Sequence, residues 1–508
     1  MDWIELVRHM MTVAYTFALV MVCVYGLHRY LLVFLYYRHR RKVPVAPGRF
    51  EELPVVTVQL PMYNEKYVAE RIIRRTCQID YPREKLQIQV LDDSTDETVQ
   101  VASAAMAETR AAGFDVEYIH RTDRTGFKAG AMEHGLATAK GEFVTIFDAD
   151  FVPEPSILRK SIDYFKDPRV CAVQTRWEHL NREESLLTRT QAIYLDGHFA
   201  IEHVARNRSG RFMSFNGTAG TWRKSAIRDA GGWQHDTLTE DMDLSYRAQL
   251  RGWKFVYVPD LTAPAELPPE MNAFKAQQFR WTKGGAQTAM KMLPRILLST
   301  APLKAKIEAF FHLSCFTVHV YVVVLVTLLL PAMCCHSLPW TRTTPYSGGL
   351  DIGVFLLATV SGCLFYVVSQ YELSGDWRTV LKYLPFLMSL GVGVSLSNTQ
   401  AVLEGLFGVR SEFVRTPKFG AGSDRYALHK QQADAQPRRS ERHLLPYVEL
   451  VYGVYMTFCA IMSLLDISTA FAAPFFVLFA VGFFYVSILT FQGYAARAAK
   501  PVPQTQKA

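Results

Sequence analysis

The stretch "EFVTIFDAD" (142–150) is the most informative part of the sequence for the fold. Its first six residues are mostly β-branched or aromatic, as in a buried strand, and the run stops at two aspartates, Asp148 and Asp150. Three similar strands precede it, and segments with helical patterning separate them. This alternation predicts an α/β fold with a mostly parallel, doubly wound sheet. The earlier strands are expected at 55–60, 87–91 and 116–120.

Acidic residues follow two of these strands. Ligands of doubly wound sheets bind beyond the carboxyl ends of the strands, where Asp148 and Asp150 follow the fourth strand and Asp92 and Asp93 the second. Two aspartates in a strand-end turn are common without any ligand. Carboxylate oxygens are also the ligands that Mg²⁺ takes, usually one or two of them together with phosphates. The apolar strand and the neighbouring acidic edge favour a metal site.

The sequence "DDST" after the second strand has two interpretations. Ser94 or Thr95 could simply cap the helix that follows. That role leaves Asp92 and Asp93 unexplained, and a carboxylate at this edge can accept a hydrogen bond from a nucleobase. Tyr63, just after the first strand, can stack on the same base. Together these residues indicate a nucleoside pocket.

Two further groups of residues lie near the starts of expected helices. Lys128 in "GFKAG" is either a solvated lysine or, beside a metal site, a contact to a diphosphate at a helix N-terminus. Glu240 and Asp241 at a helix start could do no more than complement the helix dipole. The small-residue loop "NGTAG" (216–220) shortly before them lets a bulky ligand approach, which favours a functional role.

Several common enzyme classes do not fit. The strand ends contain neither GxGxxG nor GxxxxGK[ST], which argues against a dinucleotide enzyme and a P-loop ATPase. His198, Glu202 and His203 invite a zinc interpretation, but a third ligand and a general base are missing. We therefore expect these three residues to be structural.

Long apolar runs place this chain in a membrane. The chain has 508 residues and a net charge of +8. The first apolar run ends in the basic cluster "RHRRK" (38–42), and the positive-inside rule puts this cluster and the domain after it in the cytoplasm. The runs lie at 10–37, 309–335, 352–371, 381–408, 446–467 and 470–493.

The basic stretch 410–445 should also be cytoplasmic. By parity, the run 381–408, which contains "SLSNTQ", cannot be a simple span, and we expect it to be interfacial or re-entrant. The sequence thus predicts about five spans, with the N-terminus outside and the C-terminus inside.

The ordered motifs "PMYNE", "DDSTDET", "GFKAG", "FDADFVP", "FNGTAG", "TEDMDL" and "QQFRW" resemble a known family over roughly residues 53–295. The chain is similar to membrane-integrated family 2 glycosyltransferases, which carry a D, DxD, TED and Q(Q/R)xRW signature. The resemblance is to cellulose synthase and to the cellulose synthase-like A mannan and glucomannan synthases. It implies a cytosolic Rossmann-like (GT-A) domain joined to transmembrane and interfacial helices.

The resemblance also implies a role for each motif residue. Asp241, with Glu240, would be catalytic, and Asp148 and Asp150 would hold Mg²⁺ or Mn²⁺. The donor would contact Tyr63, Asp92, Asp93, Lys128, Gln277 and Arg280. The acceptor would contact Phe215, Asn216, Gly217, Thr218 and Trp281. The stretch "FVRTPK" (413–418) resembles a gating loop, with Phe413, Thr416 and Lys418 at the matching positions and Arg415 where the pattern has Val.

The function implied is a processive, inverting β-glycosyltransferase that passes its polymer across the membrane. Its partners would be a UDP-glucose or GDP-mannose donor, a growing β-glycan acceptor and membrane lipid, with no nucleic acid. It would lie in the cytoplasmic (inner or plasma) membrane, or in the Golgi membrane of a eukaryote. The alternative is a non-processive enzyme that glycosylates a ceramide or diacylglycerol.

The expected segments follow from these assignments. They are a membrane helix at 1–42, the glycosyltransferase domain at 43–270, interfacial helices at 271–306, a hairpin with the re-entrant segment at 307–408, the gating loop at 409–445 and a final hairpin at 446–508. The helix expected at 271–293 is amphipathic and carries Arg280 and Trp281. These two residues would either anchor it at lipid headgroups or lie in the active site.

Overall fold

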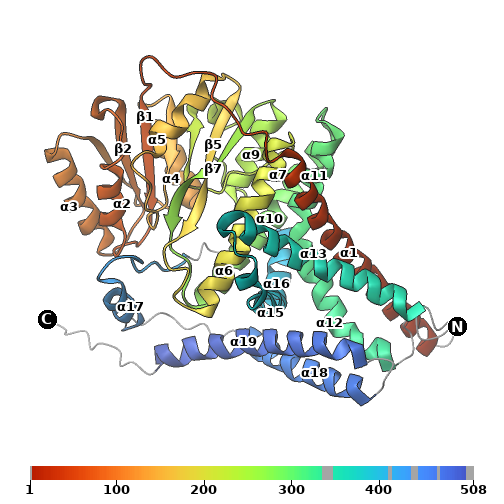
Figure 1. Cartoon of the computed structure of the whole chain (residues 1–508). Helices are drawn as coiled ribbons and strands as arrows, with labels where there is room; N and C mark the ends of the chain where they lie inside the picture. The colour runs from red at the N-terminus through yellow and green to blue at the C-terminus, as the bar shows by residue number, and fades with distance from the viewer. Residues whose placement is uncertain (1–2, 335–346, 410–414, 436–443, 466–469, 499–508) are drawn as a thin grey trace.

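The computed structural model describes residues 3–334, 347–409, 415–435, 444–465 and 470–498. An α/β domain lies on one side of the molecule and long helices lie on the other (Figure 1). The helix α1 (Trp3–His39) packs along α12 (Val318–Cys334) and α13 (Ser347–Ser374), and α18 (Leu445–Leu465) packs along α19 (Ala473–Ala498).

The domain is built on a seven-stranded sheet with the order β3-β2-β1-β4-β6-β5-β7. Neighbouring strands are parallel except at β6, which runs antiparallel to β4 and β5, so the prediction of a mostly parallel sheet is confirmed. The carboxyl ends of β1, β2, β4 and β5 therefore meet at one edge. The strands are β1 (Val56–Met62), β2 (Leu86–Asp92), β3 (Asp115–His120), β4 (Phe143–Ile146), β5 (Val170–His179), β6 (Gly220–Arg223) and β7 (Lys254–Ala265).

Helices cover both faces of the sheet. Alternation along β4 sends Phe143 into one apolar cluster, with α2, α3 and α5, and Val144 and Ile146 into another, with α4 and α6. Burying each such side chain contributes roughly 1.5–3 kcal/mol. The helices are α2 (Ala69–Thr76), α3 (Thr98–Ala111), α4 (Phe127–Leu136), α5 (Ile157–Ser161), α6 (Leu186–Gly197), a π-helical turn (His198–Glu202), α7 (His203–Arg208), α8 (Lys224–Asp229) and α9 (Glu240–Leu250).

Five helical stretches among the described residues are long and apolar enough to cross a membrane, as predicted. The segment 381–408, expected to be interfacial or re-entrant, consists of two helices, α15 (Leu384–Gly393) and α16 (Ser395–Leu406), which meet at a bend of 46°. Either a re-entrant loop or a broken span has this geometry. The five stretches are Trp3–His39, Leu303–Pro331, Leu356–Ser374, Leu445–Leu465 and Ala473–Ala495.

The helix α10 (Met271–Leu298) carries the "QQFRW" motif and is packed against protein on several sides. It contacts α9, α11 (Leu303–Ser314), α16 and α19. A Cβ at Gly285 would lie 2.0 Å from the Phe316 ring, so only glycine permits this approach. Lys283 is fully buried and pairs with Glu404 of α16 at 2.7 Å. The second candidate span starts at Leu303, inside the predicted interfacial segment 271–306.

Candidate active site

The two aspartates after β4 are each paired with a lysine. Lys128 Nζ lies 2.5 Å from Asp148 Oδ1, and Lys418 Nζ lies 2.7 Å from Asp150 Oδ2. Lys128 also donates to the carbonyl of Gly217 at 2.9 Å. The structure thus brings together four of the residues predicted from separate motifs, and two lysine charges balance the two carboxylates.

The donor set around Asp148 and Asp150 fits a divalent cation that is completed by a substrate. Mg²⁺ and Mn²⁺ take carboxylate oxygens, and Mg²⁺ is usually held by one or two carboxylates together with substrate phosphates. The described residues contain no cluster of three or more His, Cys, Asp or Glu that could hold a metal by itself. The remaining ligands would therefore come from a diphosphate, and the Asp148 side chain, 36% exposed, is open to one.

Asp241 lies at the start of α9 beside the loop that follows α7. Gly217 in this loop has φ of +75°, and a Cβ there would lie 3.1 Å from Asp241 Oδ2 and 3.5 Å from Lys128 Nζ. The positive φ favours glycine at this position, and a Cβ there would crowd these two charged groups. Burial and, after it, the neighbouring carboxylate of Glu240 together raise the pKa of Asp241 to about 7. Asp241 is therefore a carboxylate that binds a proton near neutral pH.

Arg280 extends from α10 toward the same carboxylates. Burial lowers the pKa of its guanidinium, and the charges of Glu240, Asp148 and Asp241 act in the opposite direction. Trp281 is partly buried and packs against the apolar cluster that contains Ile146, and Gln277 is one helical turn earlier on the same helix. Arg280 is thus close enough to Glu240, Asp148 and Asp241 for their charges to act on it, which disfavours a headgroup anchor.

The acidic pair at the end of β2 already forms hydrogen bonds and an ion pair within the protein. Asp92 is fully buried and accepts hydrogen bonds from the Tyr118 hydroxyl at 2.6 Å and the Ser94 amide at 2.9 Å. Asp93 is held by Arg121 through two bonds of 2.8 and 2.5 Å. The structure contradicts the alternative that Ser94 or Thr95 caps the following helix. The carboxylate of Asp96 instead accepts a hydrogen bond from the amide of Thr98 at the start of α3.

Tyr63 stacks against a cation that the sequence did not single out. The Arg124 guanidinium lies 3.3 Å from the centre of the Tyr63 ring. Arg121 and Arg124 both belong to "HRTDRTGFKAG" (120–130), just before Lys128. Their position between a strand end and the lysine predicted to bind a diphosphate could have indicated that these two arginines lie at the site.

The loop predicted to bind the acceptor directs its side chains into the protein. Phe215 is 1% exposed and packs on Trp222, with ring centres 5.5 Å apart. The hydroxyl of Thr218 accepts a hydrogen bond from the Asp148 amide at 2.8 Å. These contacts tie the loop to β4 and β6. The loop thus supports the acidic centre, and the side chains of Phe215 and Thr218 are buried.

Asn216 is held between the two histidines that could have suggested zinc. The His203 ring nitrogen Nε2 lies 2.5 Å from Asn216 Oδ1, and Asn216 Nδ2 lies 3.0 Å from His198 Nε2. The other nitrogen of His198 is 2.9 Å from Glu202. Because the amide nitrogen of Asn216 can only donate, His198 Nε2 accepts and His198 Nδ1–H donates to Glu202. Because the amide oxygen of Asn216 can only accept, His203 Nε2–H donates to it. These residues have a structural role in positioning the loop.

The predicted gating loop lies over the same edge of the sheet. Thr416 is 4% exposed, and Lys418 reaches Asp150 as described above. Phe413 lies outside the described residues. Arg415, at the position where the resembling pattern has Val, donates to the carbonyl of Tyr63 at 3.2 Å and lies 3.4 Å from Glu65. The arginine thus joins the loop to the first strand end.

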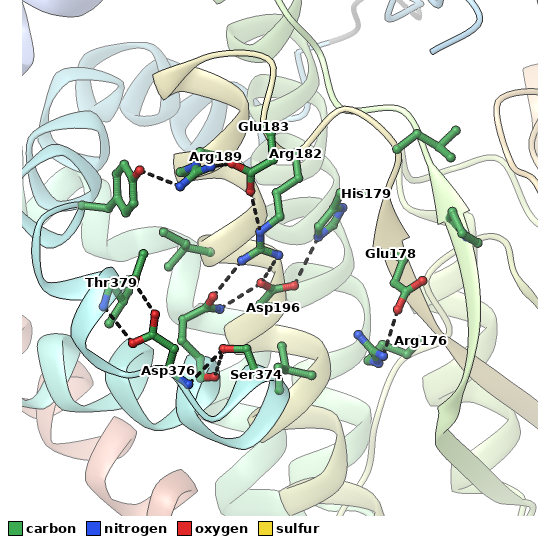
Figure 2. A pocket seen from close by; sticks show the side chains of 17 residues that line it. Arg176, Glu178, His179, Arg182, Glu183, Arg189, Asp196, Ser374, Asp376 and Thr379 are labelled. Carbon is green, nitrogen blue, oxygen red and sulfur yellow. Dashed lines mark hydrogen bonds and ion pairs between the residues drawn. The ribbon is translucent and has the colours of Figure 1, made fainter. Parts of the chain in front are cut away.

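A separate pocket of about 650 Å³ lies between β5, α6, α13 and α14 (Arg378–Leu381), and it contains none of the predicted site residues. Its charged groups pair with one another (Figure 2): Arg182 bonds to Asp196 at 2.6 Å and to Gln370 at 2.7 Å. Burial and these donors leave the pKa of Asp196 at about 2, because His179 and Arg182 outweigh desolvation. This network joins the domain to α13.

Comparison with known proteins identifies the family. The family profile "Glycosyltransferase like family 2" matches residues 54–284. Glucomannan 4-beta-mannosyltransferase 2 of Arabidopsis thaliana is 39% identical over 376 residues, which cover 73% of this chain and 68% of that protein. The chain belongs to the family 2 glycosyltransferases of the cellulose synthase-like A type. The resemblance drawn from the ordered motifs is therefore confirmed.

Two more similarities extend over most of this glycosyltransferase. Glucomannan 4-beta-mannosyltransferase 1 of Cyamopsis tetragonoloba is 34% identical, covering 82% of this chain and 78% of that protein. The mannosyltransferase PcManGT of Pyrobaculum calidifontis, solved in complex with GDP-Man and Mn²⁺, matches 79% of this chain and all of that chain, with a TM-score of 0.51 and 21% identity. This second likeness confirms the GT-A fold of the glycosyltransferase.

Proposed function

We propose that this glycosyltransferase transfers mannose from GDP-mannose to the end of a growing β-linked glycan, with inversion at the transferred carbon. The observation that carries the proposal is the meeting of Asp241, Lys128 and Asp148 around Gly217. The choice of mannose is supported by the names of the relatives, which are glucomannan 4-beta-mannosyltransferases, and by the GDP-Man bound to PcManGT.

Asp241 is the proposed general base. The acceptor hydroxyl attacks the anomeric carbon, and its proton passes to the Asp241 carboxylate as the bond to the diphosphate breaks. A base whose pKa lies near 7 is suited to this step at neutral pH, and such a base contributes typically ~10²–10⁴-fold. A single displacement without a covalent intermediate inverts the sugar, so an α-linked donor gives a β-linked product.

Positive groups stabilise the leaving diphosphate. Lys128 and Arg280 converge on the acidic centre from two different helices. Charge that develops on the leaving phosphate is best stabilised by donors already fixed in place. A Mg²⁺ or Mn²⁺ ion held by Asp148 and Asp150 would add further neutralisation of this charge when bound. Mn²⁺ is named with PcManGT, and it supports the choice of a divalent cation here.

The base of the donor is proposed to stack on Tyr63. The Arg124 guanidinium lies against this ring in the structure, so a bound base would either displace the guanidinium or share the ring with it. Asp92 and Asp93 are proposed to shape this pocket indirectly, because their carboxylates already bind Tyr118 and Arg121. Gln277 and Trp281 are proposed to line the sugar and acceptor side from α10.

The proposed topology places the glycosyltransferase domain in the cytoplasm. The membrane helices would lie in the plasma or inner membrane or, in a eukaryote, in the Golgi membrane. The basic cluster 38–42 at the end of α1 supports this orientation. The product would leave between the membrane helices that pack on α10. We retain the division into a domain at 43–270 and a gating loop at 409–445 as part of this proposal.

A donor comparison tests the proposal directly. Purified protein in detergent with Mn²⁺ is given radiolabelled GDP-mannose or UDP-glucose, and incorporation into glycan is counted. We expect incorporation from GDP-mannose at a rate at least about tenfold above that from UDP-glucose, since a site built around one donor rejects another by such factors. Incorporation from UDP-glucose alone would contradict the mannosyl assignment and leave the fold and family unchanged.

A further inference from the structure

A buried glutamate outside the predicted motifs holds the loop that carries Lys418. Glu266 follows β7 and is 3% exposed. Its carboxylate accepts hydrogen bonds from three successive backbone amides, those of Phe419 at 2.7 Å and of Gly420 and Ala421 at 3.0 Å each. Three consecutive amides can converge on one anion only where the chain turns sharply, and Gly420 supplies the turn with φ of +80°.

Further contacts bring this turn to the metal aspartates. The Glu266 amide donates to Asp150 Oδ2 at 3.1 Å, and the Glu266 carbonyl accepts from Lys418 Nζ at 3.0 Å. Arg71 of α2 bridges the same two segments, because it donates to the Ala421 carbonyl at 2.6 Å and to the Asp150 carbonyl at 3.0 Å. The turn 419–421 is therefore fixed beside Asp150 from two sides.

This anchoring determines what Lys418 does. Its ammonium bonds Asp150 Oδ2 at 2.7 Å, and both side chains are largely buried, at 12% and 7% exposure. A carboxylate oxygen that is bonded to an ammonium has less capacity left for a cation. An ammonium and a divalent cation at the same oxygen also repel each other.

We propose that Glu266 is a positioning residue that holds Lys418 on Asp150, so that the lysine occupies a metal-binding carboxylate and competes with the divalent cation. The proposal rests on the proposed function, because it takes Asp150 to be a metal ligand. When the metal-bound donor arrives, Lys418 leaves Asp150 while Glu266 keeps the turn 419–421 in place. The loop thereby makes metal binding depend on the donor, because a cation without the donor must by itself displace the lysine from Asp150.

The test measures binding of Mn²⁺ alone to the full-length, nucleotide-free protein, from the free-ion signal in electron paramagnetic resonance. We expect Lys418→Gln to lower the Mn²⁺ dissociation constant about tenfold, because the competitor is removed. Arg415→Gln is the matched control: it removes a nearby positive charge that bonds Tyr63 and Glu65 instead of Asp150, and it should change affinity less than about threefold. An unchanged or weaker affinity in Lys418→Gln would overturn the proposal.

Glu266→Gln gives a test whose sign is decisive. Removing a negative charge near the site should weaken Mn²⁺ binding by electrostatics alone. The proposal predicts the opposite, a tightening of about threefold or more, because the amide side chain cannot accept from three backbone amides and releases Lys418. In a Lys418→Gln background the same change should no longer tighten binding. Tightening by equal factors in both backgrounds, or weakening in the wild-type background, would contradict the role of Glu266.

Asp150→Asn separates this inference from the proposed function. It should abolish the Mn²⁺ binding on which the comparisons depend, and equal binding by wild type and Asp150→Asn would overturn the inference. A donor preference for UDP-glucose would instead overturn the mannosyl assignment. The ratios between variants and wild type would be unaffected by that result, because no nucleotide is present.

Discussion

Asp241→Asn should lower the transfer rate by at least about 10²–10⁴-fold, because the acceptor hydroxyl then has no base to take its proton. Binding of GDP in the presence of Mn²⁺ should change little, since Asp241 faces Gly217 and Lys128 and is not one of the two proposed metal ligands. Stopped-time assays with radiolabelled GDP-mannose measure the rate, and calorimetry measures GDP binding. Retained turnover in this variant would refute the assignment of the base.

The pH dependence follows from the same carboxyl group. Its pKa is raised to about 7, so the proportion of active, ionised base in the wild type should rise with pH through that value, where half of it is ionised, and level off at higher pH. Because the pKa of Asp241 is higher in the folded than in the unfolded protein, this group's contribution to folding stability is fully present below its unfolded pKa of about 4. That contribution is lost as the pH rises toward 7. Asp241→Asn should therefore unfold at a higher temperature than wild type at pH 8, and by less at pH 5.

Arg280→Lys should lower transfer by about 10²-fold, although the positive charge is kept. A guanidinium offers a planar fork of donors to phosphate and carboxylate oxygens, and an ammonium on a shorter reach does not replace it. Losing one fixed donor at a developing negative charge typically costs about 10²–10³-fold. The readout is the initial rate at saturating GDP-mannose.

Arg295→Lys is the matched control for Arg280→Lys, because Arg295 is exposed on the same helix α10. The active-site interpretation predicts full activity for Arg295→Lys and a severe loss for Arg280→Lys. An anchor at lipid headgroups would predict nearly full activity for both. Two variants of equal activity would therefore contradict the placement of Arg280 beside Glu240 and Asp148.

Local sequence patterns were sufficient for the architecture of this chain. Strand alternation and strand-end acids depend on neighbouring residues, so the strands ending at Met62, Asp92 and Ile146 were predicted to within two residues. The ordered motifs then brought Asp148 and Asp241 into one site. The five apolar stretches follow from composition, and the unusual character of 381–408 follows from the parity of the spans and the basic stretch after it.

Pairings between distant residues could not be predicted in this way. Lys418 meets Asp150 across 268 positions, and Glu266 meets Ala421 across 155, because tertiary packing brings their segments together. Side-chain direction was also hidden: Phe215 belongs to the motif "FNGTAG", yet its ring packs in the core against Trp222. A motif thus identifies the segment at a site without showing which of its atoms face the ligand.

Processive synthesis of a β-linked mannan is tested by the length of the product. Purified protein with Mn²⁺ and a limiting supply of radiolabelled GDP-mannose is stopped after less than one donor per potential acceptor has been consumed, and the product is sized by gel filtration before and after endo-β-mannanase digestion. We expect long chains alongside unused acceptor, and we expect the mannanase to degrade all of these chains. A single mannose on a membrane lipid, resistant to the mannanase, would contradict processive synthesis.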